Sequence, residues 1–479
     1  MRQKQTKIIA TVSDQKCDPE FIRSLHDNGV DAIRLNTAHQ THSDTLRVIK
    51  NIRKVSERIA IILDTKGPEI RTCLTDGRVI LKKGGTVKIA GSNEGKVSTN
   101  DLVYVNYPGF VKDVPEKTTI LIDDGELGLK VIKKNPKHLL CEVLNDGEIK
   151  PNKSINIPNL HLNLPSLSGK DRDYINFAIR HNLDFIAHSF VRNKEDILAI
   201  QKILDKHNSK IKIIAKIENQ EGVDNIEEIL DYSYGVMVAR GDLGVEIPAE
   251  EIPLIQKKII KICIARHEPV ITATQMMHSM IKSSRPTRAE VSDVANAILD
   301  GTDAIMLSGE TAYGDYPIEA VRVMAKIIQH TEANTESTDH LPAFKGENAI
   351  SNFLAKSAVI ASRELGAKEI IISAASGFSA EVIASYRGRV PIFVKCFDKK
   401  TARGLALTYG INAHVVKKEE NHKRFLKNLF TSLVKKGKLA EKDKVIYLAG
   451  DVGNNSITNF MEICEVGKYV GLASPNKKL

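Results

Sequence analysis

Two stretches of the sequence each end an apolar run with charged side chains of the kind that hold a metal ion. The first, Ile211–Asn219, carries Lys216 and Glu218 near its end, and the second, Ala239–Glu246, carries Asp242. Because residues two apart in a strand share a face, Lys216 and Glu218 are expected to point the same way. Mg²⁺ takes one or two carboxylates from a protein and fills its other positions with water and substrate oxygens. Glu218 and Asp242, on neighbouring strands, therefore predict a Mg²⁺ site with the Lys216 cation beside it.

A lysine and a divalent cation that face the same oxygen would stabilise negative charge developing on that oxygen and so lower a reaction barrier. Taken alone, a Lys–Glu pair is more often a structural ion pair than a reactive site. Chemistry is favoured because many candidate strands end in polar groups, which are costly to bury without partners. These groups are Arg34 and Asn36, Asp64, Ser189, Lys216 and Glu218, Asp242, Thr274 and Ser308.

Further residues near these strand ends suit the binding of an anionic substrate. Gly241 lets the backbone come close to a ligand. Arg34 and Arg71 suit bidentate contacts with phosphate oxygens, although either fits a structural charge as well. Thr274 equally suits the N-cap of a following helix. The sequence contains no Walker-type phosphate loop and no Gly-x-Gly-x-x-Gly, so a bound nucleotide must be held by other means.

The first two thirds of the chain alternate short apolar runs with helical patterns, which is typical of a parallel α/β fold. Eight such units favour a closed (β/α)₈ TIM barrel, in which catalytic residues gather at the carboxyl ends of the strands. An open doubly wound sheet is the alternative. The predicted strands are Lys7–Ser13, Ala32–Ala38, Ile59–Asp64, Phe185–Phe190, Ile211–Glu218, Gly235–Arg240, Pro269–Thr274 and Ala304–Ser308.

A strand-rich segment with frequent turn signals interrupts this alternation over residues 72–164. We expect it to form a small β-barrel domain inserted between a barrel strand and its helix, which resumes after Ser168 as a plausible N-cap. Placed on the rim of the barrel, this domain is positioned to act as a lid that excludes water. The catalytic barrel then comprises residues 1–71 and 165–334.

A polar, irregular stretch after residue 334 predicts a linker, followed by a C-terminal α/β domain over residues 348–479. Strands are expected there at Glu369–Ser373, Pro391–Cys396, Ala413–Val416 and Val445–Ala449. The stretch Ser373–Ser379 falls where a strand turns into a helix, and its N–H and hydroxyl groups suit a phosphate nest. A capped helix terminus without a ligand explains the same residues equally well.

Composition narrows the class of protein further. The 479 residues are 42% hydrophobic and 27% charged, as in an ordinary water-soluble protein, and no apolar run is long enough to cross a bilayer. The net charge of +10 is dispersed among acidic residues, which is typical of a solvated surface and not of nucleic-acid binding. Six widely spaced cysteines predict neither a disulfide framework nor a cysteine zinc site. We expect a cytoplasmic protein without nucleic-acid or membrane partners.

Several motifs, in this order and on this scaffold, resemble the pyruvate kinase family over essentially the whole chain, including the inserted domain and the C-terminal domain. The motifs are Asp64–Arg71, Lys216–Asn219, Val238–Gly244, Ala273–Met276, Arg285–Glu290, Ser292–Ala297 and Leu307–Thr311.

The resemblance implies transfer of the phosphoryl group of phosphoenolpyruvate to ADP, giving pyruvate and ATP in the last step of glycolysis. Lys216 then resembles the cation that stabilises the phosphoryl group in flight and the enolate left behind. Glu218 and Asp242 resemble the Mg²⁺ ligands. The backbone at Gly241 and Asp242, together with Thr274, would hold the substrate carboxylate. Thr274 is also similar to the residue that helps to protonate the enolate carbon.

The same resemblance implies residues for the phosphates and the nucleotide. Arg34 is expected at the transferring phosphoryl group, and Arg71 at the nucleotide phosphates. Asn36 and His39 are expected on the nucleotide side of the site. Asp124 resembles a lid residue that closes over the site.

The family commonly uses K⁺, bound by side chains matching Asn36, Asp64 and Thr65 and by a serine whose position is Ala38 here. One ligand is therefore missing. We expect a weaker or absent K⁺ requirement, although Glu69, which accompanies K⁺ dependence in the family, is retained.

The resemblance further implies a homotetramer and a sugar-phosphate effector near Ser376, Gly377 and Ser379. Two rival interpretations are a different barrel enzyme acting on phosphoenolpyruvate or an enolate, and an inactive scaffold that kept the fold. The sequence leaves open the identity of any effector, the preferred nucleoside diphosphate, the K⁺ requirement and the state of assembly.

Overall fold

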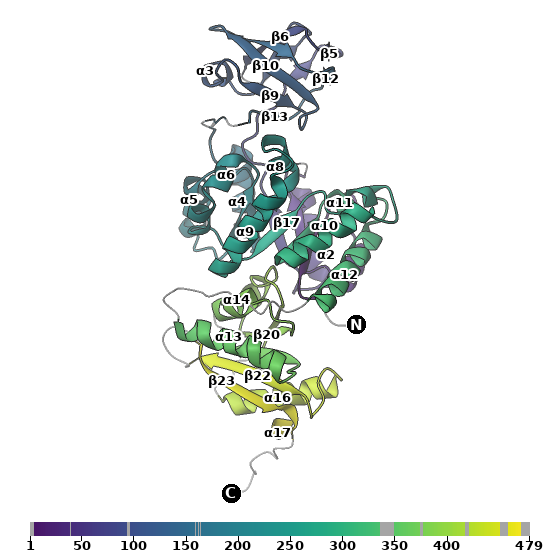
Figure 1. The fold of residues 1–479 in the computed structure, drawn as a ribbon, viewed down its shortest axis with the longest axis vertical. Coiled ribbons are helices and arrows are strands. Elements are labelled where there is room, and N and C mark those ends of the chain that lie inside the picture. The colour runs from purple at the N-terminus through teal and green to yellow at the C-terminus, as the bar shows by residue number, and fades with distance from the viewer. Residues whose placement is uncertain are drawn as a thin grey trace.

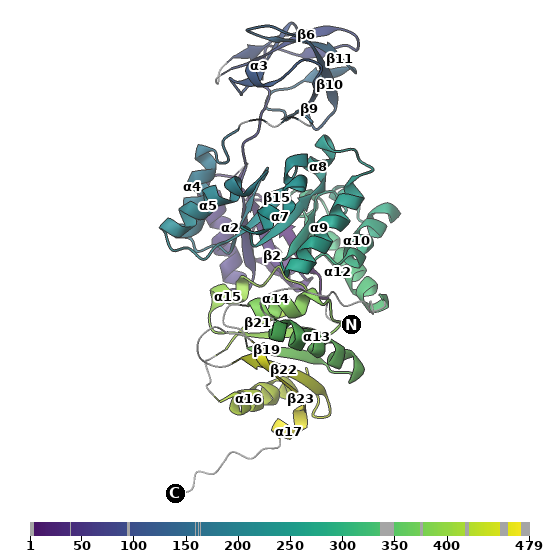
Figure 2. The ribbon, with the colours of Figure 1, turned by 60° about the vertical axis from the view of Figure 1, so that its left-hand side comes forward.

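A computed structural model describes residues 4–38, 40–92, 96–158, 160, 162, 164–335, 349–373, 377–416, 421–450 and 458–470, without the side chain of His422. Three bodies follow one another along the long axis of the molecule (Figure 1). An all-β body lies at one end, a ring of strands and helices in the middle, and a smaller α/β body at the other end. A second view shows the same order of bodies (Figure 2).

The middle body is a closed barrel of eight parallel strands, in the order β1-β18-β17-β16-β15-β14-β3-β2. The closed ring rules out the open sheet and confirms the predicted (β/α)₈ barrel, and each predicted strand is present to within a few residues. The strands are β1 (Lys7–Thr11), β2 (Ala32–Asn36), β3 (Ala60–Asp64), β14 (Phe185–His188), β15 (Lys212–Ile217), β16 (Gly235–Ala239), β17 (Val270–Ala273) and β18 (Ala304–Leu307).

These strands form because each is apolar on both faces, as parallel strands covered on both sides must be. One face fills the barrel interior with side chains such as Ile62, Phe185 and Met237. The other face packs against the surrounding helices. The longer of these helices are α1 (Pro19–Asp27), α2 (His42–Val55), α4 (Gly169–Arg180), α5 (Lys194–Lys206), α9 (Ile252–Arg266), α10 (Arg288–Asp300) and α12 (Pro317–Asn334).

Short helices lie in the connections that follow β15, β16, β17 and β18. They are α6 (Gln220–Asp224), α7 (Ile226–Leu230), α8 (Arg240–Glu246), the 3₁₀ helix η1 (His278–Ile281) and α11 (Gly309–Ala312). The predicted N-cap of α4 is confirmed, because Ser168 and Asp171 form a reciprocal capping box. This cap fixes the start of α4 after the inserted domain.

The all-β body is inserted between β3 and α4 and has a hydrophobic core of its own. A small β-barrel was expected here. The observed strands form a six-stranded sheet and two two-stranded sheets around one core, and in the described part of this body the sheets do not close into a barrel. Its elements are β4 (Leu74–Thr75), β5 (Val79–Leu81), β6 (Thr86–Gly91), β7 (Val97–Ser98), β8 (Leu102–Val105), α3 (Phe110–Asp113), β9 (Thr119–Ile122), β10 (Leu127–Lys134), β11 (Leu139–Val143), β12 (Gly147–Ile149) and β13 (Ile155–Asn156).

The C-terminal body is a five-stranded sheet in the order β21-β20-β19-β22-β23, with helices on its faces. The four predicted strands are present, and β23, which pairs antiparallel with β22, was not predicted. Its elements are α13 (Ala349–Glu364), β19 (Glu369–Ser373), α14 (Phe378–Ser385), β20 (Ile392–Cys396), α15 (Lys399–Arg403), β21 (Ile411–Val415), α16 (His422–Lys435), β22 (Lys444–Gly450), β23 (Thr458–Glu465) and α17 (Val466–Val470).

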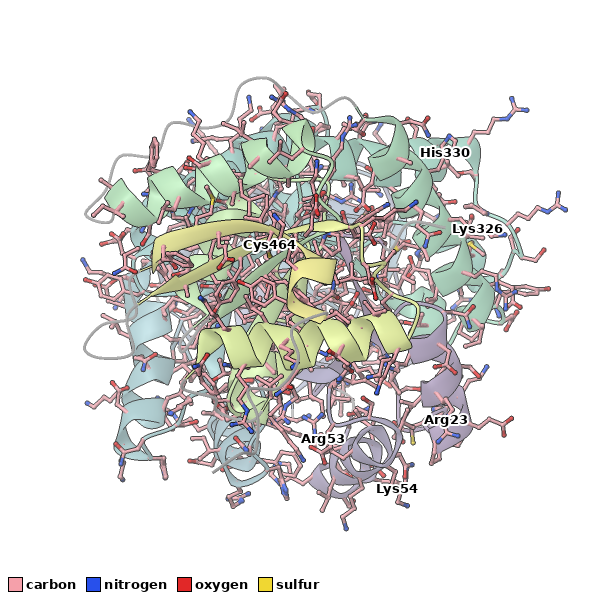
Figure 3. All side chains as sticks on the ribbon, turned by 90° about the horizontal axis from the view of Figure 1, so that it is seen from below. Arg23, Arg53, Lys54, Lys326, His330 and Cys464 are labelled. Atoms are coloured by element: carbon pink, nitrogen blue, oxygen red, sulfur yellow. The ribbon has the colours of Figure 1, made fainter. Side chains whose placement is uncertain are left out.

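This body closes the amino-terminal end of the barrel, opposite the inserted domain. Leu407 belongs to the same buried cluster as the side chains of the barrel interior. Arg387 forms an ion pair of 2.8 Å with Asp303 at the start of β18. Seen from this end, Cys464 of β23 lies over the middle of the molecule, and Arg23, Lys326 and His330 lie at its periphery (Figure 3). No helix in the described ranges is long and apolar enough to span a membrane.

Candidate active site

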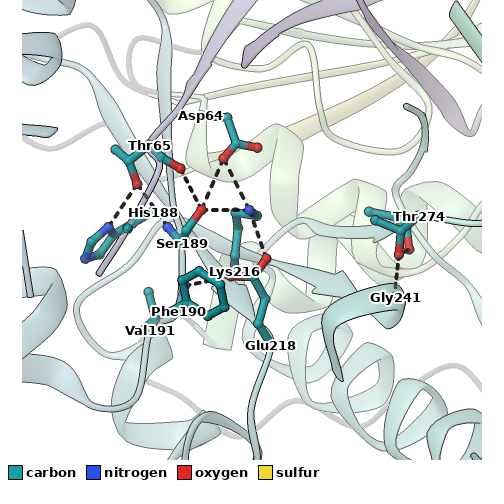
Figure 4. Close-up of polar contacts among 12 residues, drawn as sticks. Asp64, Thr65, His188, Ser189, Phe190, Val191, Lys216, Glu218, Gly241 and Thr274 are labelled. Carbon is teal, nitrogen blue, oxygen red and sulfur yellow. Dashed lines mark hydrogen bonds and ion pairs between the residues drawn. The ribbon is translucent and has the colours of Figure 1, made fainter. Parts of the chain in front are cut away.

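Lys216 lies at the centre of a polar cluster formed where β3, β14 and β15 end (Figure 4). Its Nζ is 2.7 Å from Ser189 Oγ, 3.2 Å from Asp64 Oδ1 and 2.9 Å from Glu218 Oε1. Burial by itself would lower the pKa of Lys216, but the Asp64 and Glu218 carboxylates outweigh burial and raise it. The structure therefore holds a charged ammonium group, 8% exposed, at the carboxyl end of the barrel.

Asp64 joins this lysine to Arg34 on the neighbouring strand. The Arg34 Nε donates to Asp64 Oδ2 at 2.5 Å, and its second contact is Thr11 Oγ1 at 3.3 Å. Burial would raise the pKa of the Asp64 carboxyl, but the Arg34 and Lys216 cations hold it below its ordinary value. An ionised aspartate thus fixes the guanidinium group at the rim, as expected of a residue that meets phosphate oxygens.

Two carboxyl groups lie beside Lys216 as the sequence predicted. Glu218 follows β15 and its Oε2 accepts a hydrogen bond of 2.7 Å from the backbone N–H of Phe190. Asp242 lies in the first turn of α8, after β16. Burial raises the pKa of Glu218 to about 7, with Lys216 opposing the rise and Asp242 adding to it. Burial likewise raises the pKa of Asp242, and the lid residue Asp124 adds to that rise.

These raised pKa values indicate two acids whose negative charges are incompletely compensated in the protein alone. A divalent cation between them would favour the ionised form of both, so the donor set fits Mg²⁺. Within the described ranges, no cluster of three or more His, Cys, Asp or Glu side chains could hold a metal. Mg²⁺ commonly fills the positions that two carboxylates leave open with water and substrate oxygens.

Thr274 and Gly241 meet across the ends of β17 and β16. The N–H of Gly241 donates to Thr274 Oγ1 at 2.7 Å, and this hydroxyl donates to the Ala273 carbonyl at 2.6 Å. Thr274 and Gln275 both have positive φ, of 66° and 52°. Non-glycine residues adopt this conformation at a cost, and such strain is concentrated at functional sites. The cost is offset nearby by Arg240, which binds the Thr274 carbonyl and both carboxylate oxygens of Asp293.

Arg71 and Asp124 belong to the lid side of the site. Arg71 donates to Glu69 Oε2 at 2.7 Å and to the Asn152 carbonyl, so it is held at the base of the lid. Asp124, which has a φ of 54°, accepts a hydrogen bond of 2.9 Å from Ser154 Oγ. The negative charge of Asp124 contributes to the raised pKa of Asp242.

The predicted K⁺ ligands are adjacent, but their oxygens already have partners. Asn36 and Asp64 pair in the register of β2 and β3, and Asn36 Oδ1 accepts the Ala38 N–H at 3.1 Å. The two carboxylate oxygens of Asp64 accept hydrogen bonds from Arg34 and Lys216. The Thr65 carbonyl accepts the Ser189 hydroxyl at 2.7 Å. Since Ala38 also lacks a hydroxyl, these residues fit K⁺ poorly.

Four predicted residues gain no support from the contacts of the cluster. His39 and Ser376 lie outside the described residues. Gly377, with a φ of 96°, is the N-cap residue of α14, and Ser379 is buried in the first turn of that helix. These positions are compatible with a helix N-terminus that has no ligand as well as with an effector site.

Two residues of the cluster had no assigned role in the sequence. Ser189 stood at a predicted strand end, and its hydroxyl connects Lys216 with the Thr65 carbonyl. His188 is buried and its Nδ1 is 3.3 Å from Thr65 Oγ1. Burial lowers the pKa of His188 to about 4, so the ring is neutral, and its tautomer decides which of the two atoms donates. Only the apolar context of His188, at the end of a buried strand, was visible in the sequence.

Comparisons with known proteins agree with this architecture. A family model described as pyruvate kinase, barrel domain, matches residues 3–321, and one described as pyruvate kinase, alpha/beta domain, matches residues 352–464. The chain is 50% identical to a pyruvate kinase of Borreliella burgdorferi over 472 residues, which cover 97% of this chain and 98% of that protein. It is 42% identical to one of Bacillus licheniformis over 484 residues, with coverage of 98% and 81%.

A solved structure of a pyruvate kinase from Cryptosporidium parvum superposes with a TM-score of 0.91 at 36% identity. The match covers 97% of this chain and 96% of that one. The similarity therefore includes the inserted domain and the C-terminal domain as well as the barrel. This similarity excludes the rival interpretation of a different barrel enzyme that lacks these two domains.

Proposed function

The chain belongs to the pyruvate kinase family and is a phosphotransferase of glycolysis, and on this premise we propose how its own residues carry out the reaction. The substrates are phosphoenolpyruvate and ADP. The bond between phosphorus and the enol oxygen breaks, a bond forms between phosphorus and a terminal oxygen of ADP, and the enolate takes a proton at carbon to give pyruvate. The observation that carries this proposal is the position of the buried Lys216 ammonium. It lies 2.9 Å from Glu218 Oε1 and at the same end of the barrel as Asp242.

Lys216 stabilises charge on the bridging oxygen as the phosphoryl group leaves. Its position is fixed by Ser189 and Asp64, so little reorganisation is needed when charge develops. Arg34, itself fixed by Asp64, binds the transferring phosphoryl group. When bound to Glu218 and Asp242, Mg²⁺ would supply further positive charge at the substrate oxygens.

The substrate carboxylate is proposed to bind at the turn that joins β16 to α8. The backbone at Gly241 and Asp242 and the hydroxyl of Thr274 line this turn. Thr274 is also our candidate for the group that positions a proton near the enolate carbon. Because its hydroxyl accepts the Gly241 N–H, a rearrangement of this hydrogen bond is expected when the carboxylate binds.

The nucleotide is proposed to bind between the barrel rim and the lid, near Arg71, Asn36 and His39. Asp124 closes over the metal carboxylates from the lid. The K⁺ requirement is proposed to be weak or absent, because Ala38 removes a ligand. A titration that shows tight, obligatory activation by K⁺ would contradict this part of the proposal.

We propose the following roles for the domains of the chain. Residues 1–71 and 165–334 form the catalytic barrel, 72–164 the lid and 348–479 a regulatory domain. We propose a homotetramer that acts in the cytoplasm and binds a sugar-phosphate effector near Ser376, Gly377 and Ser379.

The test follows pyruvate formed from phosphoenolpyruvate and Mg²⁺ with each nucleoside diphosphate in turn, with and without K⁺. We expect turnover that Lys216→Met lowers by roughly 10²-fold or more. The control is Lys210→Met, which removes an exposed lysine shortly before the same strand. Unchanged turnover in Lys216→Met, with its circular dichroism spectrum preserved, would remove the central assignment. A wild-type protein without turnover would instead favour an inactive scaffold.

A further inference from the structure

We propose that Glu381 of the C-terminal body is a positioning residue for phosphotransfer, because it holds the amino ends of the two strands that present Lys216, Glu218 and Asp242. The inference rests on the proposed function of those three residues. Glu381 lies on α14, at the opposite end of the barrel from the site, and is 8% exposed. It touches no reacting atom, so its effect must pass through the strands.

Glu381 binds one residue of each strand start. Its Oε1 accepts a hydrogen bond of 2.6 Å from the hydroxyl of Tyr234 and forms an ion pair of 3.5 Å with Lys212 Nζ. The Lys212 ammonium also lies 3.5 Å from the centre of the Tyr234 ring, in a cation–π contact. Both residues reach the carbonyl of Gly404, at 2.9 Å from Lys212 and 3.0 Å from the Tyr234 hydroxyl. The three side chains therefore form one closed unit that spans the two bodies.

Lys212 is the first residue of β15, and Tyr234 immediately precedes β16. Lys216 and Glu218 lie at the other end of β15, and Asp242 lies in the helix that follows β16. At about 3.3 Å per residue, the six steps from Lys212 to Glu218 cover about 20 Å. The two strands pair in continuous parallel register between these ends.

A displacement at the start of such strands is carried to their ends, because buried, close-packed elements deform little. β16 is buried along its whole length, and β15 is buried after its first residue. Tyr234 and Leu407 both pack in the cluster of the barrel interior, which further connects the C-terminal body with β15 and β16. Loss of the Glu381 contacts is therefore expected to change the spacing between the metal carboxylates.

The same interface provides a matched control. Asp303 is another buried carboxylate there, bound to Arg387 of the C-terminal body at 2.8 Å and to the backbone N–H groups of Val270 and Tyr409. It precedes β18, which carries neither Lys216 nor a metal carboxylate. Asp303→Asn thus makes the same chemical change at the same interface, at a carboxylate whose hydrogen bonds and ion pair in the described ranges go to Arg387, Val270 and Tyr409.

The experiment compares Glu381→Gln, Tyr234→Phe and Asp303→Asn with the wild-type chain. For Glu381→Gln we expect kcat to fall about fivefold and the Mg²⁺ concentration for half-activation to rise about fivefold. Tyr234→Phe should change kcat and the Mg²⁺ concentration for half-activation in the same direction but by less. The variant that combines Glu381→Gln with Tyr234→Phe should show a fold-change smaller than the product of the two single fold-changes. Mn²⁺ binding without nucleotide, followed by electron paramagnetic resonance, should weaken in parallel.

Asp303→Asn is expected to lower the melting temperature and to leave metal affinity within twofold of wild type. The inference is overturned if Glu381→Gln and Tyr234→Phe both leave metal affinity within twofold, or if Asp303→Asn changes it equally. If Glu381→Gln does not fold, Tyr234→Phe decides the question, because it removes only one hydroxyl. Wild-type protein without turnover would overturn the proposed function, whereas active wild type with unaffected variants would overturn this inference alone.

Discussion

Ser189 connects the cation of the site with the turn that leads to the lid. Its Oγ accepts a hydrogen bond from Lys216 Nζ and donates one to the Thr65 carbonyl, both at 2.7 Å. Hydrogen bonds to charged groups contribute roughly 1.5–3 kcal/mol, so we predict that Ser189→Ala lowers kcat about 10- to 100-fold. Steady-state kinetics at saturating substrates measure this. A kcat within twofold of wild type would show that Asp64 and Glu218 suffice to hold the ammonium group.

Glu268 gives the folded state a pH dependence that is separate from catalysis. It follows the end of α9, where burial raises the pKa of its carboxyl from 4.5 to about 8, with partial compensation by Arg266 at 3.6 Å. The folded state therefore binds this proton more tightly than the unfolded state. The contribution to stability is present below about pH 4.5 and is lost as pH rises through 8.

We therefore predict that Glu268→Gln is more stable than wild type at pH 8 and gains little at pH 5. Melting temperatures of both proteins across this range provide the measurement. A stability difference that does not change with pH would mean that Glu268 is not protonated in the folded protein.

At the scale of elements, the turn after β3 is fixed by close packing. Gly67 has a φ of 74°, and a Cβ there would lie 2.8 Å from the Phe190 ring and 2.9 Å from Ser189 Cβ. We predict that Gly67→Ala lowers kcat at least about tenfold, because it displaces Ser189 and the Phe190 N–H that holds Glu218.

Gly77→Ala is the matched control for this substitution. Gly77 has a similar φ of 66°, but no atom lies within 4 Å of the added Cβ. It should cost about 1 kcal/mol of stability from backbone strain and leave kcat unchanged. Equal kinetic effects of the two variants would show that strain, and not contact with the site, is responsible.

The element scale also shows how far sequence reasoning reaches. The shared location of Lys216, Glu218 and Asp242 was predictable, because charged side chains directly after a buried apolar strand are costly unless they have partners or a function. The positive φ of Thr274 and Gln275 was not predictable, since no glycine marks it and Thr274 contacts the N–H of Gly241 in α8, which is distant in sequence. The same holds for β23, an edge strand whose faces alternate little in polarity. The roles of Ser189 and His188 depend on neighbours distant in sequence.

At the scale of the whole molecule, the lid has a hydrophobic core of its own and a narrow base. Its core shares no residue with that of the barrel. Arg71 and Ser154 form an antiparallel bridge, and the Thr72 N–H donates to the Lys153 carbonyl at 2.9 Å. The chain therefore enters and leaves the lid at adjacent points.

We predict that replacing residues 74–151 by two glycines leaves a folded barrel and lowers phosphotransfer about 10³-fold, because water reaches the site and Asp124 is absent. Circular dichroism melting and the pyruvate assay are the measurements. Retention of more than a tenth of the activity would show that the lid is dispensable. Failure to fold would show that the two cores depend on each other.

The paired stems of the lid have a consequence for adaptation to temperature. A domain joined to the barrel through one short antiparallel bridge has few contacts to break if it rotates about the backbone bonds of its two connections. Substitutions that stabilise the barrel against heat are therefore expected to leave the movement of the lid unchanged. Substitutions in the two connections are expected to change that movement without destabilising the barrel.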